Sequence, residues 1–217
     1  MRIIFIGAPG TGKGTQAQWI TNQYNIPKIS TGDILRNTVL DNTELSKKIK
    51  KFINYGKLVD DNIIIRLIKK RMEEKDCHQG FLLDGFPRTV VQANELKKNK
   101  IKIDYVIEFL LQDELILKRI QGRRIHTKSG RIYHITYNPP KIENYDDVTG
   151  EKLVTREDDT QEKIKKRIQE YKIFTVPLIQ YYKYESILGN VKYYKIDANA
   201  TALKIKNNIK NILKNSY

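Results

Sequence analysis

Residues 7–13 read Gly7-Ala8-Pro9-Gly10-Thr11-Gly12-Lys13, which matches the glycine-rich phosphate-binding loop G-x-x-x-x-G-K. A run of β-branched residues at 2–6, typical of a buried strand, precedes this loop, and a helical pattern over 13–24 follows it. Glycines let successive backbone N–H groups turn toward a phosphate, and the helix N-terminus adds a positive dipole end. We therefore predict a phosphate-binding loop in which Lys13 reaches the β- and γ-phosphates of a nucleotide.

The residue after this lysine departs from the usual loop. Ser or Thr at that position normally holds Mg²⁺, whereas here Gly14 follows the lysine and Thr15 comes next. We expect nucleotide oxygens and water molecules to supply most of the ligands of the ion. Asp84, which ends a predicted buried strand at 81–83, is the candidate protein contact, acting through water.

Strands and helices alternate along most of the chain. We predict strands at 2–6, 28–30, 81–83, 105–111 and 191–196, and helices at 13–24, 44–55, 62–74, 90–99, 114–121, 161–187 and 201–214. A further helix ends at Leu40 and is expected to be capped by Thr31 or Asp33, and Pro177 is expected to kink the helix over 161–187. The alternation predicts an α/β fold of the P-loop type, with a doubly wound five-stranded parallel sheet and helices on both faces.

Residues 122–159 interrupt this alternation. They contain Gly, Pro, Thr and Asp and only short alternating stretches such as 131–135. We predict an insertion of small β-hairpins with little hydrophobic core of its own.

Composition narrows the class of protein. The 217 residues are 40% hydrophobic and 30% charged, which suits a single domain of ordinary size with or without an insertion. No apolar run approaches the roughly 18–20 residues of a membrane span, and the strand at 2–6 leaves no room for a cleavable signal peptide. The single cysteine, Cys77, excludes an internal disulfide framework, so we expect a cytoplasmic protein.

The net charge of +15 has two interpretations. One is binding of nucleic acid or another anionic ligand. The other is a compositional bias, because Lys, Asn and Ile, all with A/T-rich codons, number 29, 16 and 31. Nucleic-acid binding gives no reason for isoleucine to be abundant, which favours the bias.

The form GxPGxGKGT, followed by Ser30-Thr31-Gly32-Asp33 and Asp84-Gly85-Phe86-Pro87-Arg88, resembles the nucleoside monophosphate kinases. Over residues 1–214 the chain is similar to adenylate kinases of the bacterial long-lid type. The resemblance implies a core of residues 1–29, 60–121 and 160–217, a nucleoside-monophosphate-binding segment of residues 30–59, and a lid of residues 122–159.

The activity that the resemblance implies is reversible phosphoryl transfer from MgATP to AMP, giving two ADP, in adenine nucleotide homeostasis and nucleotide biosynthesis. Such an enzyme is expected to be a cytoplasmic monomer with neither nucleic acid nor membrane as a partner. The reaction brings two polyanions into line, so the site must neutralise charge and exclude water. By resemblance, the catalytic residues are Lys13, Asp84, Arg88, Arg123, Arg156, Asp158, Asp159 and Arg167.

The resemblance also implies the residues of the two nucleotide sites. Those around ATP are Gly10, Thr11, Gly12, Lys13, Gly14, Thr15, Arg119, Arg123, Ile132, Tyr133 and Ala200. Those around AMP are Thr31, Arg36, Lys57, Leu58, Val59, Gly85, Phe86, Pro87, Arg88, Gln92, Arg156 and Arg167. Relatives often have lysine where Ala200 stands, so a main-chain contact is all that this position implies. Gln92 is the informative residue, because its amide can pair with the adenine edge as both donor and acceptor; its alternative role is that of an exposed helix residue.

Four lid positions bear on a structural metal. Some relatives hold zinc with four cysteines, and the same spacing here reads His126, Ser129, Asp146 and Thr149. Ser and Thr are poor zinc ligands and no thiol is present, so we expect a hydrogen-bonded polar network without zinc.

Two other functions are considered. One is a kinase for a pyrimidine monophosphate such as UMP or CMP, against which the 38-residue lid, Gln92 and Thr31 argue. The other is a basic P-loop protein that binds nucleic acid, for which the chain has no RNA-binding module and no aromatic and basic signature.

Overall fold

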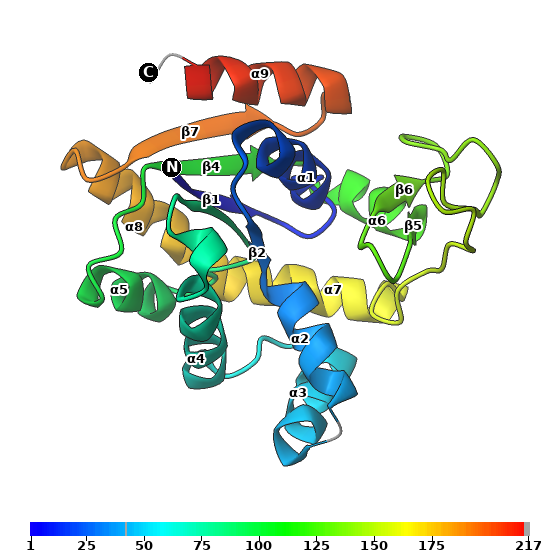
Figure 1. Ribbon diagram of the computed structural model, residues 1–217, viewed down its shortest axis with the longest axis horizontal. Helices are drawn as coiled ribbons and strands as arrows, with labels where there is room; N and C mark the ends of the chain where they lie inside the picture. The colour runs from blue at the N-terminus through cyan, green and yellow to red at the C-terminus, as the bar shows by residue number, and fades with distance from the viewer. Residues whose placement is uncertain (42, 215–217) are drawn as a thin grey trace.

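The computed structural model describes residues 1–41 and 43–214. Within these residues, a parallel sheet of five strands has the order β2-β3-β1-β4-β7 (Figure 1). The strands are β1 (Arg2–Gly7), β2 (Lys28–Ser30), β3 (Phe81–Asp84), β4 (Tyr105–Leu110) and β7 (Lys192–Asp197). Because the chain extends the sheet to both sides of β1, the predicted doubly wound sheet is confirmed.

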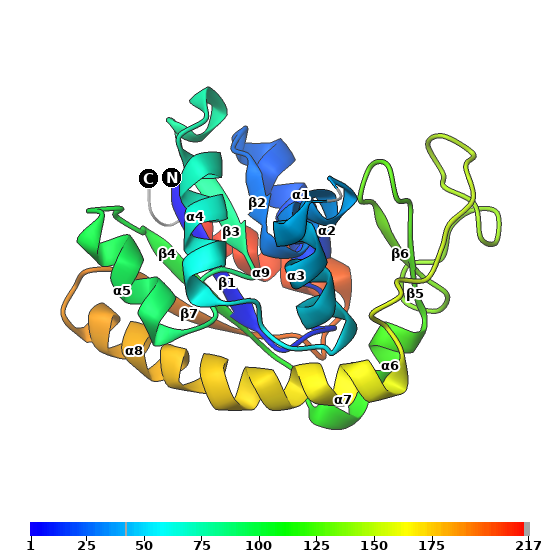
Figure 2. The same ribbon diagram turned by 90° about the horizontal axis from the view of Figure 1, so that it is seen from below.

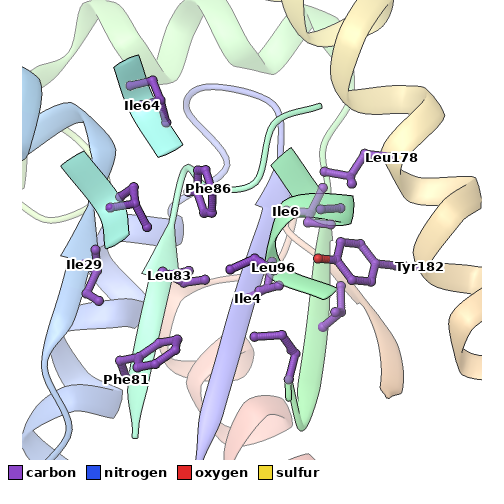
Figure 3. Packing of buried hydrophobic residues seen from close by; sticks show 14 of the residues in the cluster. Ile4, Ile6, Ile29, Ile64, Phe81, Leu83, Phe86, Leu96, Leu178 and Tyr182 are labelled. Carbon is purple, nitrogen blue, oxygen red and sulfur yellow. The ribbon is translucent and has the colours of Figure 1, made fainter. Parts of the chain in front are cut away.

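Helices cover both faces of the sheet (Figure 1). Side chains alternate along β1, so Ile3 and Phe5 pack with α1 (Lys13–Tyr24) and α9 (Ala202–Lys214). Ile4 and Ile6 point to the opposite face, where Leu96, Leu178 and Tyr182 also pack (Figure 3). The helices of that face are α4 (Asp61–Met72), α5 (Val90–Lys98) and α8 (Val176–Ile187).

The segment after β2 forms two helices, α2 (Thr31–Leu40) and α3 (Glu44–Asn54), which extend below the sheet in Figure 1. Ser30 caps α2 by accepting a hydrogen bond from the backbone N–H of Asp33, so the expected cap at Thr31 or Asp33 was wrong. The Thr31 hydroxyl instead donates to the carbonyl oxygen of Gly85 at 2.9 Å. Asp33 pairs with Lys28 and Arg36.

The predicted helix over 161–187 is present in three parts. α7 (Gln161–Glu170) leads into a π-helical turn at Tyr171–Thr175, and α8 follows with Pro177 in its first turn. Figure 2 shows these parts as one curved rod along one side of the molecule. Proline lacks a backbone N–H and its ring crowds the preceding turn, so the irregular turn lies just before it rather than at the proline itself.

The lid stands at the side of the sheet beyond α6 (Asp113–Gln121) (Figure 1). It contains an antiparallel pair of strands, β5 (Arg123–Ile125) and β6 (Ile132–His134), with isolated bridges that tie Ile125 to Val154 and Tyr145 to Lys152. Among the described residues, no helix is long and apolar enough to cross a membrane. A 3₁₀ turn at Lys75–Cys77 precedes β3.

The register of the strands brings three loops to one edge of the sheet. Asp84 at the end of β3 lies opposite both Phe5 and Ser30, and Gly7 at the end of β1 lies opposite Phe109. The carboxyl ends of parallel strands in such sheets are where ligands bind. The phosphate-binding loop, the start of α2 and the loop after Asp84 therefore face the same space.

Candidate active site

A cleft of about 400 Å³ opens at this edge and draws its walls from the sheet, α2–α3, the lid and α7. This volume is that of a small-molecule site. The predicted site residues that line it are Gly10, Thr11, Gly12, Lys13, Gly14, Thr15, Thr31, Arg36, Lys57, Leu58, Val59, Asp84, Gly85, Pro87, Arg88, Gln92, Arg119, Arg123, Ile132, Tyr133, Arg156, Asp158, Arg167 and Ala200. Residues that lie far apart in the sequence, from the phosphate-binding loop to Ala200, are thus brought together.

Two predicted residues lie outside this lining. The Phe86 side chain is 2% exposed and packs in the core beside Ile6 and Leu83 (Figure 3). The Phe86–Pro87 bond is cis. Pro87 and Arg88, which follow Phe86, line the cleft. The Asp159 carboxylate is 5% exposed and contacts two arginines behind the cleft surface.

The Lys13 side chain folds over its own loop. Its Nζ donates to the carbonyl oxygens of Gly7 and Ala8, both at 2.7 Å, and to Thr11 Oγ1 at 3.0 Å. Burial lowers the pKa of this ammonium to about 8, while Asp84 partly opposes the shift. A cation held in a low-dielectric loop attracts an incoming phosphate more strongly than an exposed one does.

Arginines converge on the cleft from separate elements. Arg36 comes from α2, Arg88 from the loop after β3, and Arg123, Arg156 and Arg167 from the lid and α7. Burial, followed by the nearby Arg167, lowers the pKa of Arg88 to about 10. Burial, followed by Arg123 and Arg36, lowers the pKa of Arg156 to about 10. The guanidinium groups of Arg88 and Arg156 therefore stay charged at neutral pH although nearby arginines repel them.

Two carboxylates from the end of the lid offset part of this repulsion. Asp158 Oδ2 accepts from Arg167 at 2.9 Å, and Asp159 Oδ2 accepts from Arg123 Nε at 2.8 Å. Burial opposes ionisation of Asp158, yet Arg167 and Arg156 bring its pKa below the ordinary value. Both aspartates therefore pair with arginines of the site.

Some of the donor capacity of the arginines is not used within the described part of the chain. The buried Nε atoms of Arg119 and Arg156 have no hydrogen-bond partner there. The Arg119 guanidinium also lies over the Tyr137 ring, 5.2 Å from its centre. Since buried donors are nearly always paired, these two point to a ligand with acceptor oxygens or a π-system.

The loop after β3 is built around Gly85. Its φ is +82°, and a Cβ there would lie 2.7 Å from Thr31 Oγ1 and 2.9 Å from Arg88 Nη2, so only glycine fits. Arg88 Nε donates to the Gly85 carbonyl oxygen at 2.9 Å, which holds the guanidinium at the cleft.

Gln92 lies at the start of α5 and is 2% exposed. Its Oε1 accepts from the Arg88 backbone N–H at 2.7 Å, and its Nε2 donates to Asp61 Oδ1 at 2.7 Å. The alternative that Gln92 is an exposed helix residue is therefore wrong. Asp61 also accepts from Thr89 Oγ1 at 3.1 Å.

The polar network predicted in the lid is present. His126 Nδ1 lies 2.7 Å from Ser129 Oγ, Thr149 Oγ1 donates to Asp146 Oδ2 at 2.9 Å, and Thr149 Oγ1 lies 3.4 Å from His126 Nε2. Arg131 and Tyr133 extend the network by donating to Asp146, and Glu151 lies 2.6 Å from His126 Nε2. The Tyr133 hydroxyl is thereby fixed inside the lid. Among the described residues, no group of three His, Cys, Asp or Glu side chains is placed to hold a metal ion.

Glu170 and Tyr137 line the cleft and were not among the predicted site residues. Glu170 Oε2 accepts from the Leu58 backbone N–H at 3.0 Å, which joins α7 to the segment after α3. Glu170 lies three residues after Arg167, on the same side of a helix, and this spacing was the available signal. Tyr137, under Arg119, follows β6 in a stretch with no periodicity that could have singled it out.

Comparison with known proteins gives a consistent result. The family model for adenylate kinase matches residues 5–187. The adenylate kinases of three strains of Buchnera aphidicola subsp. Acyrthosiphon pisum (Tuc7, 5A and APS) are each 55% identical to this chain over 214 residues. Each alignment covers 99% of this chain and 100% of the relative. None of these matches supports a UMP or CMP kinase or a nucleic-acid-binding protein.

Proposed function

The chain belongs to the adenylate kinase family, and from that premise we propose how its own residues divide the work of the reaction. The protein is an ATP:AMP phosphotransferase, which transfers a phosphoryl group reversibly from ATP to AMP and yields two ADP. The observation that carries the proposal is the convergence of Lys13 and a cluster of arginines on one cleft at the carboxyl ends of the strands. Phosphoryl transfer depends mainly on positioning and on charge neutralisation, which such a cluster supplies.

ATP binds on the phosphate-binding loop and under the lid. Backbone N–H groups of residues 10–15 and the positive end of α1 cradle the phosphates, and Lys13 exchanges its loop carbonyl partners for phosphate oxygens. Arg119 contacts the adenine, with Ile132 and the main chain at Ala200 nearby. It lies over Tyr137, and its Nε has no hydrogen-bond partner among residues 1–41 and 43–214. Arg123 binds the phosphate chain.

Mg²⁺ enters with ATP. A Cβ on Gly14 would lie 3.7 Å from Asp84 Oδ2, so the carboxylate faces the start of α1, where the phosphates bind. A carboxylate oxygen is the type of ligand that Mg²⁺ prefers, and the absence of Ser or Thr after Lys13 leaves room for water between them. Asp84 would hold the hydrated ion, which supplies charge neutralisation when bound.

AMP binds on the other side of the cleft. Arg36 and Arg88 bind its phosphate, helped by Arg156 and Arg167. Thr31, Gly85, Lys57, Leu58 and Val59 surround the nucleoside, and Gln92 pairs with the adenine edge. The phenyl ring of Phe86 takes no part, because it packs in the core.

Three parts of the chain carry these roles. The core is residues 1–29, 60–121 and 160–217, the AMP-binding segment is residues 30–59, and the lid is residues 122–159. The lid brings Arg123, Arg156 and Asp158 to the cleft from its two ends, with Asp159 paired to Arg123 behind the lining. Its closure over bound nucleotide excludes water from the transferred phosphoryl group. The polar network around His126 and Asp146 holds the lid together without zinc.

The proposed setting is a cytoplasmic monomer that does not bind nucleic acid or membranes. The basic charge is attributed to composition, because the site needs only the few arginines in the cleft. A filter-binding test with RNA at about 0.15 M salt measures this directly, since nonspecific electrostatic binding is weak at that ionic strength.

The activity is tested with a coupled assay of ADP formation across AMP, UMP, CMP and GMP with ATP as the donor. We expect AMP to be the preferred acceptor by a wide margin. Equal or faster turnover of UMP or CMP would show that AMP is not the preferred acceptor, and it would contradict the proposed role of Gln92.

A further inference from the structure

The side-chain amide of Gln92 is held at both ends by the protein itself. Its Nε2 donates to Asp61 Oδ1 at 2.7 Å, and its Oε1 accepts from the Arg88 backbone N–H at 2.7 Å. The chain of contacts continues, because Asp61 Oδ2 also accepts from Thr89 Oγ1 at 3.1 Å and Thr89 Oγ1 accepts from the Gln92 backbone N–H at 3.1 Å. Gln92 is 2% exposed yet lies at the wall of the cleft.

These contacts allow only one orientation of the amide. An ionised carboxylate can only accept hydrogen bonds and a backbone N–H can only donate. If the amide turned over, Oε1 would face the Asp61 carboxylate and the NH₂ group would face the Arg88 N–H. Both hydrogen bonds would be lost, one of them to a charged group. Two acceptors would then face each other at Asp61 and two donors at Arg88, in a buried environment.

The fixed orientation leaves a defined recognition edge. A primary amide has two N–H groups and two oxygen lone pairs, and Asp61 and Arg88 occupy one of each. One N–H and one lone pair of known placement remain. A 6-aminopurine offers a donor at the 6-amino group and an acceptor at N1, whereas a 6-oxopurine offers an acceptor at O6 and a donor at N1.

We propose that Asp61 is a specificity-determining positioning residue, which locks the Gln92 amide in the orientation that pairs with a 6-aminopurine and opposes a 6-oxopurine. This inference rests on the proposed role of Gln92 at the acceptor base. Asp61 acts through Gln92 and touches no substrate. The specificity of the acceptor site then resides in a carboxylate 31 residues away in sequence from the residue that contacts the base.

AMP and IMP test this directly, because they differ only at the 6-position and N1 of the base. We compare kcat/KM for both acceptors, with ATP as the donor, in wild type, Asp61→Asn, Asp60→Asn and Gln92→Leu. The asparagine introduced by Asp61→Asn can present either its oxygen or its NH₂ group, so the contact at position 61 no longer selects one orientation of the Gln92 amide and only the Arg88 backbone N–H still opposes its turning. The AMP preference should fall roughly 10-fold or more in Asp61→Asn, the value of one hydrogen bond to a charged group, mainly through the KM of the acceptor.

Asp60→Asn is the matched control. It removes the same charge one residue away, and Asp60 caps α4 through the Asn62 backbone N–H at 2.9 Å without a contact to Gln92. Asparagine caps helices as well as aspartate does. The AMP preference of Asp60→Asn should therefore equal that of wild type. If Asp60 and Asp61 only stabilised the start of α4, both substitutions would change the AMP preference by the same amount.

The outcomes separate the two levels of the proposal. If Gln92→Leu keeps the wild-type AMP preference, Gln92 does not contact the base and the proposed function of this residue is wrong. If Gln92→Leu loses the preference while Asp61→Asn and Asp60→Asn both keep it, the role of Asp61 is wrong and that of Gln92 stands. An unchanged KM for ATP in each variant shows that the fold is intact.

The wild-type protein gives an independent measurement in case Asp61→Asn does not fold. The Gln92 Nε2 proton bonded to Asp61 should be protected from exchange in the nucleotide-free protein, with one slow proton and one faster proton on the same nitrogen in NMR spectra. Addition of AMP should slow the second proton. Fast exchange of both protons before AMP is added would contradict a locked amide.

Discussion

Arg123 and Asp159 join the two ends of the lid. Arg123 begins β5, just after α6, and Asp159 lies 36 residues later, just before α7. Arg123 Nε donates to Asp159 Oδ2 at 2.8 Å, a second bond joins Arg123 Nη2 to Asp159 Oδ1, and the two side chains are only 13% and 5% exposed. Pairing through two hydrogen bonds of a planar guanidinium fixes both side chains. The two ends of the lid are therefore tied together where the lid joins the core.

The first prediction concerns Asp159→Asn. Asparagine can still accept one hydrogen bond, but the charge of Arg123 beside Arg156 is no longer compensated. The free energy of unfolding should therefore fall by about 2 kcal/mol. This value lies between the cost of losing an exposed ion pair and that of breaking a fully buried one. For a chain of this size the melting temperature should drop by about 4–8 °C. Differential scanning calorimetry without nucleotide measures it.

Glu157→Gln is its control, because Glu157 is exposed and the same charge is lost from the same segment. Added tripolyphosphate should raise the melting temperature of Asp159→Asn more than that of Glu157→Gln, since the polyanion supplies the missing charge. Equal melting temperatures for the two variants would mean that the pair contributes nothing to stability.

The second prediction concerns the protonation of Lys13. Its pKa in the free protein is lowered to about 8, below that of an unfolded lysine, and bound phosphates favour the charged form. ATP binding should therefore take up close to one proton at pH 9 and almost none through this group at pH 6.5. In the free protein the charged Lys13 opposes folding below about pH 8, and this cost falls as pH rises from about 8 to about 10.5, because the unfolded chain then binds more protons.

Calorimetric titration with ATP at pH 9, in two buffers of different ionisation enthalpy, counts the protons. Lys13→Met is the matched variant, which should fold, lose most of its turnover and show no uptake from this group. Near-normal turnover of folded Lys13→Met would remove the lysine from the proposed site.

The third prediction separates the two nucleotides. Arg88 lies in the loop after Asp84, and Arg119 lies at the end of α6 beside the lid. Arg88→Ala should raise the KM for AMP by roughly 10- to 100-fold, which corresponds to the loss of one or two hydrogen bonds to a charged group, and should leave the KM for ATP nearly unchanged. Arg119→Ala should raise the KM for ATP and leave the KM for AMP nearly unchanged. Equal weakening of both nucleotides by Arg88→Ala would show that Arg88 is not the clamp of the acceptor phosphate.

Local sequence was sufficient for much of the fold. The strand at 2–6, the glycine loop and the helix from Lys13 are contiguous, and their hydrophobic pattern and glycine spacing act over short distances. The cap of α2 was wrong by one residue, because Ser30, Thr31 and Asp33 all have side chains able to cap and only the tertiary contact of Thr31 with Gly85 decides between them.

The long-range parts of the site could not be predicted in this way. Glu170 meets Leu58 across 112 residues, and Asp61 meets Gln92 across 31, so local patterns do not reveal either pair. The spacing of Glu170 from Arg167 could point to Glu170 itself but not to its partner. Phe86 lies inside a motif of site residues, yet its ring packs in the core. The family resemblance supplied which residues gather at the cleft, and the packing determined what each one contacts.

The last prediction concerns motion of the lid. Residues 122–159 bury few large apolar side chains, chiefly Ile125, Tyr133 and Leu153, and rest on polar contacts that water can replace. Segments of this kind open at a low free-energy cost compared with core strands. Without ligand, the amides of the lid should therefore exchange with solvent much faster than those of β1, whose Ile3 and Ile4 are fully buried.

A bound polyphosphate should change this contrast, because Arg123 and Arg156 lie near the two ends of the lid, Arg167 lies on the adjoining α7, and all three can share one polyanion. Hydrogen exchange measured by mass spectrometry, with and without a bisubstrate inhibitor that spans both nucleotide sites, compares the two segments within one protein. The inhibitor should slow exchange over 122–159 by at least roughly tenfold and leave β1 nearly unchanged, because only the lid gains new partners on closure. Equally slow exchange of the lid in both states would mean that it is already closed without nucleotide. In that case its arginines would be preorganised by Asp158 and Asp159 alone, and the Asp159→Asn variant should show fast lid exchange that the inhibitor restores.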